Sequence, residues 1–449
     1  MKVNSLIAVF GSAIFLAGCN HEDDNDVQLR VTHASSDAPM VSVTLNGDVA
    51  SGLEKTDYQV AGDWIGLMSG SYDIAVNALL PGDQQSEVIG ANLNFSPDMQ
   101  YDVIAVNNAA SIEPVVLSRD AAGPEGNFVR LDILHAHPDV AGVDIYLSTE
   151  EDISSVDPAV SGLEFKIDSA DLPVTIPSGT YRIRVTLAGD KSAVFDSGNL
   201  ELTMGSDLMI TALPNVDGGA VSPVNLLVAD KDGYSVLRST GEKAAVRVVH
   251  AVDDAPDVDV LASGSAVDGL TMISFKEFRS KDLDPGSYDL SVAASSDNSL
   301  VVIEAPGTAL NAGSTTSIYA VGKLNSVTDE TIDPLVIAED LRSVASYAKL
   351  RVVHASPTAG GLGLVDIHAS ATGTFDATTV VLSGVDFKGT ATLNVPEGTY
   401  YLAVILAGDM TYTPAVQATA AVEDGGVYSV VATDDFAGGL LLNVDTAAP

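Results

Sequence analysis

The chain is poor in cysteine and in basic residues. A single cysteine among 449 residues excludes an intramolecular disulfide and a multi-cysteine metal cluster. Only 21 Lys and Arg stand against 61 Asp and Glu, which gives a formal net charge of −40. A field of this sign repels phosphate backbones, so we expect no nucleic-acid partner. We also expect no cofactor, although the acidic surface leaves weak binding of divalent cations open.

Aromatic residues and helical patterns are scarce as well. Phe, Trp and Tyr make up 6% of the chain, whereas Val, Thr, Ile and Ser recur in short runs that favour strands. No long stretch has the 3.6-residue periodicity of an amphipathic helix, which argues against βαβ units. The sequence also lacks the Gly-x-Ser-x-Gly, His-Glu-x-x-His, Walker and Rossmann motifs. These absences predict an all-β protein that is not an enzyme.

Long apolar runs are missing too. Beyond Cys19, no stretch approaches the ~18 continuous apolar residues of a membrane-spanning helix. The apolar stretch from Leu6 to Ala17 is also too short to span a bilayer, but behind the positive Lys2 it has the size of a signal-peptide core. It ends in LAGC (16–19), which resembles the lipobox of bacterial lipoproteins.

The lipobox resemblance implies how the chain is anchored. It implies a cleaved signal peptide over residues 1–18 and fatty acylation of Cys19, palmitate included. Residues 19–26 then form a flexible acidic tether. Asn20 stands where an Asp commonly favours inner-membrane retention, so we expect an outer-membrane lipoprotein of the cell envelope. Its first partner is therefore the membrane, reached through the lipid anchor.

Three landmarks recur four times along the chain. The first is a His-Ala step, at His33, His135, His250 and His354. The second is a Gly-x-Tyr step, at Tyr72, Tyr181, Tyr288 and Tyr400. The third is a later apolar strand, such as YDVIAV (101–106). Together they predict repeats 1 to 4, over residues 27–122, 127–232, 243–342 and 347–448.

The repeats form two pairs. From His to Tyr the spacing is 39, 46, 38 and 46 residues, so repeats 1 and 3 share one type (A) and repeats 2 and 4 another (B). Duplication of an A–B pair explains this order. Short strands separated by turn residues at roughly eight-to-twelve-residue spacing indicate β-sandwiches. We therefore predict an all-β tandem array of four immunoglobulin-like β-sandwich domains.

The turn before each tyrosine and the linkers add two expectations. A tyrosine that follows a tight turn at a strand start resembles the tyrosine corner of immunoglobulin-like sandwiches, whose hydroxyl bonds back to nearby backbone. The linkers are short, so neighbouring domains are expected to touch. Placed end to end, four sandwiches with strands of ~20–25 Å reach on the order of 100 Å from the membrane.

The recurring histidine has three interpretations. Two-residue alternation places His33 on the same strand face as Val31 and Leu29, which is the core face. A buried ring needs partners, for which the following loop and the Asp four residues on are candidates. This structural role is favoured over cation binding and over catalysis, because zinc sites need three or four ligands. The best candidates for metal ligands are His135, His137 and Asp139.

The phrase VRVVHAVDDAPDVDV (246–260), followed by its Gly-x-Tyr strand, resembles the DUF4397 family of uncharacterised domains. The resemblance recurs in each repeat. It implies β-sandwich modules of bacterial secreted or surface proteins, often in tandem and lipid-anchored, without an established enzymatic activity. Three positions depart from the repeat pattern: Asp132 replaces an Arg, Thr358 replaces an Asp, and Ser42 replaces an Asp.

These features predict a non-enzymatic, lipid-anchored envelope protein whose modules act as a surface spacer or as an adhesion or ligand-binding array. The expected ligand is an envelope protein or a polysaccharide. The alternative is a periplasm-facing binding or envelope-assembly lipoprotein, with or without dependence on cations. An accessory role in a carbohydrate- or peptide-processing system is the other alternative.

Overall fold

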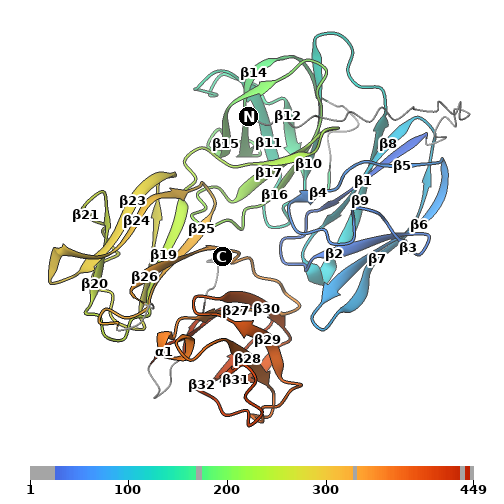
Figure 1. Cartoon of the computed structure of the whole chain (residues 1–449). Coiled ribbons are helices and arrows are strands. Elements are labelled where there is room, and N and C mark those ends of the chain that lie inside the picture. Colours follow the sequence, from blue (N-terminus) through green and yellow to red (C-terminus); the bar gives the residue numbers. More distant parts are fainter. Residues whose placement is uncertain (1–25, 168–173, 327–330, 435–439, 445–449) are drawn as a thin grey trace, which may run out of the picture.

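The computed structural model describes residues 26–167, 174–326, 331–434 and 440–444. These residues fold almost entirely as strands (Figure 1), so the predicted all-β class and the tandem of β-sandwiches are confirmed. No helix among them is long and apolar enough to cross a bilayer. The predicted signal peptide and Cys19 lie outside the described residues.

The strands of the first two repeats are β1 to β18. Repeat 1 contains β1 (Val27–His33), β2 (Val41–Leu45), β3 (Asp48–Val49), β4 (Val60–Ala61), β5 (Ile65–Leu67), β6 (Gly70–Leu80), β7 (Gln84–Phe95), β8 (Met99–Val106) and β9 (Glu113–Asp120), with the 3-10 turn η1 (Ala109–Ser111). Repeat 2 contains β10 (Phe128–His135), β11 (Val143–Ser148), β12 (Val160–Leu163), β13 (Val174–Pro177), β14 (Gly179–Leu187), β15 (Ala193–Leu202), β16 (Asp207–Pro214), β17 (Val224–Ala229) and β18 (Tyr234–Leu237).

The strands of the last two repeats are β19 to β34. Repeat 3 contains β19 (Ala244–His250), β20 (Val258–Ala262), β21 (Ser265–Ala266), β22 (Phe278–Leu283), β23 (Gly286–Ala294), β24 (Asp297–Leu310), β25 (Thr315–Val321) and β26 (Asp333–Glu339). Repeat 4 contains β27 (Ala348–His354), helix α1 (Pro357–Gly360), β28 (Val365–Ser370), β29 (Val380–Val385), β30 (Thr390–Val395), β31 (Gly398–Leu406), β32 (Val416–Val422), β33 (Val427–Ala432) and β34 (Leu440–Val444).

Each repeat contributes two sheets. The first sheet, which holds the His-Ala strand, has the order β4-β1-β8-β9 in repeat 1, with β5 also paired to β1. The second sheet of repeat 1 has the order β3-β2-β6-β7, and the other repeats follow the same plan. In repeat 2, β18 pairs with β17 although it lies beyond residue 232, where the composition indicated a linker.

Parallel pairing of two strands sets the register of every first sheet. The His-Ala strand lies parallel to the later apolar strand, and its histidine faces an alanine each time: Ala105, Ala212, Ala320 and Ala432. Leu29 and Val31 point into the core of repeat 1, where they join Val41 and Val43 of the second sheet. His33 is 1% exposed and bonds to the carbonyl of Pro39 in the loop that leads to the second sheet, so its ring lies on the core face that the alternation predicted.

The tyrosine of each Gly-x-Tyr step bonds to the preceding turn. Each hydroxyl donates to the carbonyl four residues earlier, at 3.1 Å in repeat 1, 3.0 Å in repeat 2, 2.8 Å in repeat 3 and 3.0 Å in repeat 4. This is the hydrogen bond expected of a tyrosine corner. It ties the start of β6, β14, β23 and β31 to the turn that precedes each strand.

The outer faces of the first sheets pack against each other within each A–B pair. Between repeats 1 and 2 the shared apolar cluster includes Ala34, Ile104 and Val106 on one side and Leu134, Leu213 and Leu227 on the other. Between repeats 3 and 4 it includes Val249, Tyr319 and Val321 on one side and Val353 and Val431 on the other. The His-Ala strands are therefore buried on both faces, which explains their nearly continuous apolar character.

The two pairs are joined by a polar junction. Glu242 is 2% exposed and accepts backbone N–H bonds from Val221 at 2.8 Å and Ser222 at 2.9 Å. Gly219, at φ +70°, lies against the backbone of Lys243, where a Cβ would approach to 2.8 Å. The chain between repeats 2 and 3 is thus folded onto repeat 2.

A second contact between the pairs is made by Arg342, which follows β26. Its guanidinium is 8% exposed and donates to the carbonyls of Ala38 at 2.7 Å and Ser36 at 3.2 Å. It also pairs with Asp57 at 2.5 Å and lies 5.7 Å from the ring centroid of Tyr58. All four of these partners belong to repeat 1.

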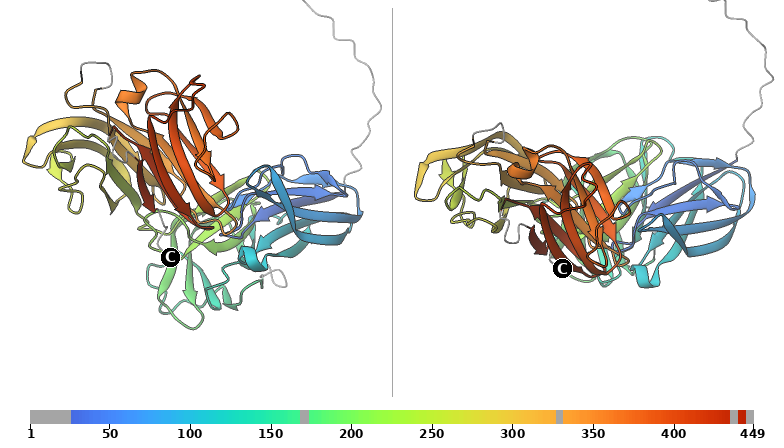
Figure 2. Two further views of the ribbon diagram at one scale, coloured as in Figure 1. Left: turned by 90° about the horizontal axis from the view of Figure 1, so that it is seen from below. Right: turned by 60° about the horizontal axis from the view of Figure 1, so that its bottom comes forward.

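The expectation that the sandwiches lie end to end is wrong. In Figures 1 and 2 they gather into one body, with repeat 4 beside repeat 3. The physical reason is that the outer faces of the first sheets are apolar. Domains placed end to end would leave these faces in water, whereas back-to-back packing buries them. The prediction that neighbouring domains touch is confirmed.

The Arg342 contact predicts how the shape responds to mutation. We expect Arg342→Ala to raise the radius of gyration and the maximum dimension of the chain in small-angle X-ray scattering, because repeat 1 loses its hold on the segment after β26. Arg279→Ala, which removes an exposed guanidinium paired with Glu277, serves as the control. Identical scattering from wild type and Arg342→Ala would contradict this role.

Candidate functional site

The four recurring histidines occupy equivalent places. Each ends its strand, is at most 1% exposed, and meets an aromatic ring edge-on at 6.2 to 6.4 Å between centroids. The aromatic partners are Tyr58, Phe165, Phe275 and Phe387. The ring is thus a regular part of the interior in every repeat.

Both ring nitrogens are engaged in repeats 1 to 3. In repeat 1, Nδ1 of His33 accepts from the backbone N–H of Ser35 at 3.3 Å, and Nε2 lies 2.9 Å from the carbonyl of Pro39. Because Nδ1 accepts, the proton belongs on Nε2, which donates to the carbonyl. His135 and His250 make the same two bonds to their own loops. The ring therefore closes the loop between the first two strands of the repeat.

Burial keeps these rings neutral. It lowers the pKa of His33 from 6.5 to about 4, against the opposing effect of the Pro39 carbonyl. Burial also lowers the pKa of His135 and of His250. At neutral pH each ring is then an uncharged donor and acceptor, as its two bonds require.

Repeat 4 departs from this arrangement. His354 is 0% exposed, yet neither ring nitrogen has a hydrogen-bond partner within the described chain. Val365 comes eleven positions after His354, whereas Val41 comes eight positions after His33. The longer loop contains α1, whose N-cap Ser356 accepts from the N–H of Ala359. The loop is therefore capped by a hydroxyl rather than by the imidazole.

The proposed metal ligands do not assemble into a site. Both nitrogens of His135 bond to backbone, and Nδ1 of His137 accepts from the N–H of Asp139 at 3.2 Å. Asp139 is exposed. Across residues 26–434, outside the undescribed gaps, no three His, Cys, Asp or Glu side chains are grouped to hold a metal ion.

The aspartate after the His-Ala step has a partner other than the histidine. Asp37 accepts from the N–H of Ala109 at 2.7 Å, and Asp254 from that of Leu324 at 2.8 Å. Both donors lie in the loop after the parallel partner strand. In repeat 4 the bond is reversed: Asp434 in that later loop accepts from the N–H of Thr358 at 3.0 Å. This exchange accounts for the threonine that departs from the repeat pattern.

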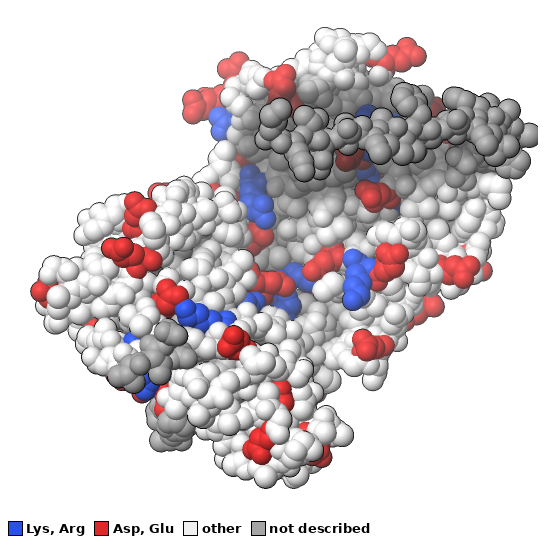
Figure 3. Space-filling model, in the orientation of Figure 1, with Lys and Arg blue, Asp and Glu red and all other residues white. Residues whose placement is uncertain are grey.

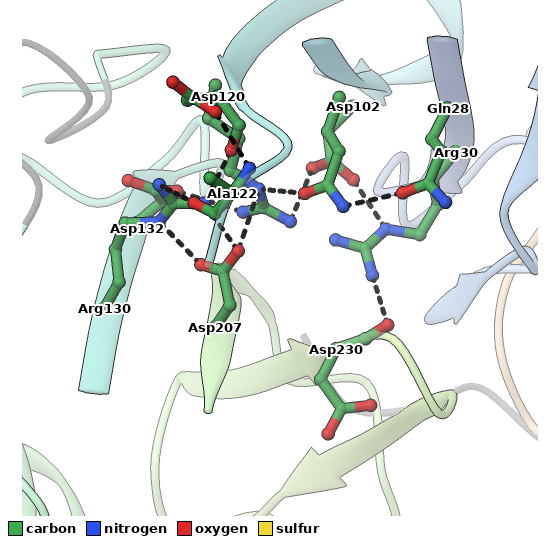
Figure 4. Close-up of polar contacts among 11 residues, drawn as sticks. Gln28, Arg30, Asp102, Asp120, Ala122, Arg130, Asp132, Asp207 and Asp230 are labelled. Atoms are coloured by element: carbon green, nitrogen blue, oxygen red, sulfur yellow. Dashed lines mark hydrogen bonds and ion pairs between the residues drawn. The ribbon is translucent and has the colours of Figure 1, made fainter. Parts of the chain in front are cut away.

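A buried network of charges crosses the interface between repeats 1 and 2 (Figure 4). Arg30 pairs with Asp102 at 2.6 Å, with side chains 1% and 3% exposed. Arg119 of repeat 1 lies 3.5 Å from Asp102 and reaches across to Asp132 of repeat 2 at 3.0 Å. Asp132, another of the three departures from the repeat pattern, is therefore the acceptor of a bond between repeats.

The interface between repeats 3 and 4 uses the opposite signs. Glu339, at the β26 position that matches Arg119, is 1% exposed and pairs with Arg351 at 2.9 Å. Arg351 occupies the β27 position that matches Asp132. Arg247 also reaches Glu339 at 3.1 Å and Ser429 of repeat 4 at 3.2 Å. The sequence shows that Asp132 replaces the arginine of the other repeats. It does not show that the residue facing this position also changes sign, from Glu339 in repeat 3 to Arg119 in repeat 1.

Basic side chains gather where repeats meet. Figure 3 shows Lys and Arg mainly along the middle of this face, with Asp and Glu also at its outer ends. Lys166 of repeat 2 pairs with Glu113 of repeat 1 at 2.8 Å, and Lys323 of repeat 3 pairs with Asp434 of repeat 4 at 3.0 Å. Several of the few positive charges of the chain thus join its domains.

Comparison with known proteins gives a family and distant structural likenesses. The model of a family described as "Domain of unknown function (DUF4397)" matches residues 27–146 and 244–367, more than half of the chain. One match was expected in each of the four repeats, but the family model matches twice. Each match begins at the start of an A repeat and ends within the second strand of the following B repeat. No curated protein sequence matches the chain.

The similar solved structures are remote. The Bacillus anthracis TIE protein is 12% identical over 88% of this chain and 69% of its own, with a TM-score of 0.15. BcpA, the major pilin subunit of Bacillus cereus, is 9% identical over 68% of this chain and 98% of its own, with a TM-score of 0.12. Likenesses at these scores carry no argument about function.

The histidine geometry predicts a pH effect on stability. The unfolded chain binds a proton near pH 6.5 and the folded chain only near pH 4, so the contribution of His33 to stability is lost as pH falls through this window. We expect the free energy of unfolding to fall by about 3 kcal/mol across this window, which is ~1.4 kcal/mol per pH unit. Urea unfolding followed by the fluorescence of Trp64, the single tryptophan, reports on repeat 1.

His33→Leu is expected to flatten the slope of stability against pH between 6.5 and 4, whatever its effect at neutral pH. Val103→Ala, a core change in the same repeat without a titrating group, is expected to keep the wild-type slope. Equal slopes in wild type and His33→Leu would show that the ring is not held neutral by the fold.

Proposed function

The chain belongs to the DUF4397 family, and from that premise we propose that it is a non-enzymatic, lipid-anchored protein of the cell envelope whose four sandwiches form one compact ligand-binding or adhesion unit. Cys19 carries the anchor, residues 19–26 form the tether, and the described domains follow at once. The unit faces an envelope protein or a polysaccharide. It resides in the outer membrane.

One observation carries this proposal: the recurring polar side chains of the repeats are engaged in holding the fold. The histidines of repeats 1 to 3 bond to their own loops, the tyrosines to their own turns, and the arginines of the His-Ala strands to carboxylates near the interfaces. A repeated catalytic residue needs a free functional atom near a space for substrate. The repeated residues here supply architecture, and any specificity lies in side chains that differ between repeats.

The compact arrangement favours a binding unit over a spacer. A spacer gains reach from domains in a row, whereas these domains pack back to back and are held together again by Arg342. Packing four modules into one body instead sets four second sheets in fixed relation to one another. Such an arrangement suits the display of different loops and sheet faces to one ligand or surface.

The anchor and the exposed side of the membrane are tested together. Cys19→Ser is expected to move the protein from the membrane fraction to the soluble fraction, because Cys19 is the acylated residue.

Protease treatment of intact cells is expected to degrade the wild-type protein while a periplasmic marker survives. A protected wild-type protein would place it on the periplasmic side. Membrane association that survives Cys19→Ser would refute the lipid anchor.

A further inference from the structure

Three basic side chains gather on the outer face of the second sheet of repeat 2. Arg182 and Arg184 leave β14 on the same face, and Lys191 follows the turn after this strand. Both arginines pair with Asp196 of β15, Arg182 at 2.5 Å and Arg184 at 3.1 Å. One carboxylate is thus shared by two guanidinium groups.

Arg184 retains unused hydrogen-bonding capacity. Its side chain is 3% exposed, and neither Nη1 nor Nη2 has a hydrogen-bond partner among the residues that the structure describes. Burying a charged donor group without acceptors is costly. The two Nη groups form the planar fork that binds a carboxylate through two parallel bonds.

Lys191 ties the loop between β11 and β12 to this face of the sheet. The ammonium of Lys191 lies 4.6 Å from the ring centroid of Tyr146 and donates to the carbonyl of Val156 at 2.5 Å. Tyr146 is 1% exposed and stands directly opposite Arg184 in the ladder of β11 and β14. Val156 belongs to the loop between β11 and β12, whose far end is held by the bond from the N–H of Ala159 to the carbonyl of Ile145 at 2.7 Å, so release of Lys191 loosens the part of the loop around Val156.

The sandwich fold does not require this arginine. The positions that match Arg184, three residues after the corner tyrosine, hold Ala75 in repeat 1, Ser291 in repeat 3 and Ala403 in repeat 4. The same sheet therefore forms with small side chains in the other three copies. Repeat 2 is the copy in which this face carries arginines; the position of Arg182 holds Asp73 in repeat 1 and Asp289 in repeat 3.

We propose that this cluster is a binding site for a small monoanionic carboxylate, held by Nη1 and Nη2 of Arg184 once the Val156 loop opens and closed in by Lys191. The basic side chains on this face are Arg182, Arg184 and Lys191. The carboxylates on the sheet are Asp196 and Asp144, and further exposed carboxylates lie beside Lys191 and in the loop between β11 and β12, namely Asp190, Glu150, Glu151, Asp152 and Asp157. Both Asp144 oxygens already accept backbone N–H bonds, at 2.7 and 2.9 Å. The single free fork formed by Nη1 and Nη2 of Arg184 matches one carboxylate.

The surroundings select the class of ligand. A chain of net charge −40 penalises a doubly charged anion more than a singly charged one. The Nη groups are fully buried when the loop is closed, so the occupant is a small molecule rather than a polymer. The site deepens the proposed binding role, and it is tested on the non-acylated chain, so the outcome is independent of where the protein resides.

The test is calorimetric titration of the non-acylated chain with sodium glucuronate, sodium acetate and sodium phosphate at one ionic strength. Wild type is expected to bind one carboxylate per chain. Arg184→Ala is expected to raise Kd about tenfold or more, because the bidentate pair is lost. Arg184→Lys keeps the charge without the fork and is expected to bind weakly too. Arg279→Ala, far from the site in sequence and exposed, keeps the wild-type Kd.

Folding of the variants is checked by far-ultraviolet circular dichroism, and Arg184→Ala is expected to fold because alanine stands at this position in repeats 1 and 4. The proposal is overturned by equal carboxylate affinity in wild type and Arg184→Ala, by the lack of carboxylate binding in wild type, or by phosphate binding more tightly than either carboxylate.

Discussion

Back-to-back packing of the first sheets within each A–B pair holds the rest of the array in place. It buries the second face of strands that already line a sandwich core, and it brings charges of opposite sign into a low-dielectric interface. A buried pair is strongly destabilised when one partner is missing or reversed. Because the signs are reversed between the two pairs, each repeat is matched only to its own partner. If repeat 1 packed against repeat 4, Arg119 would face Arg351. If repeat 3 packed against repeat 2, Glu339 would face Asp132.

Several of the few basic residues lie at the interfaces between repeats. Arg30, Arg119, Arg247 and Arg351 are buried beside carboxylates at the interfaces, and Arg342 joins the two pairs. The charged side chains that remain exposed are mainly carboxylates, which repel one another. Arg184 differs from these arginines because it is buried within a single repeat and joins no two repeats.

Much of the fold follows from local pattern. Period-two alternation located the core face of the His-Ala strand, and turn residues before each tyrosine located the corner, because both depend on neighbours close in sequence. The contacts between repeats depend on surfaces brought together from far apart. The partner of Asp132 lies in the preceding repeat, Arg342 bonds to residues some 300 positions earlier, and β18 completes a sheet from within a polar stretch. None of these has a local signal. The two-residue alternation of the strand predicted which face the histidine is on. The hydrogen bonds of the ring are seen only in the structure, as is their absence among the described residues at His354, where the following loop is longer.

The central claim is that complementary buried charges hold repeats 1 and 2 together, and a double-mutant cycle on Arg119 and Asp132 tests it most directly. Unfolding is followed by the fluorescence of Trp64, whose ring centroid lies 5.7 Å from the Arg119 guanidinium. The account predicts that Arg119→Glu and Asp132→Arg each destabilise repeat 1, and that the double reversal recovers part of the loss, with a coupling free energy of about 1–3 kcal/mol. Strictly additive effects of the two substitutions would contradict it.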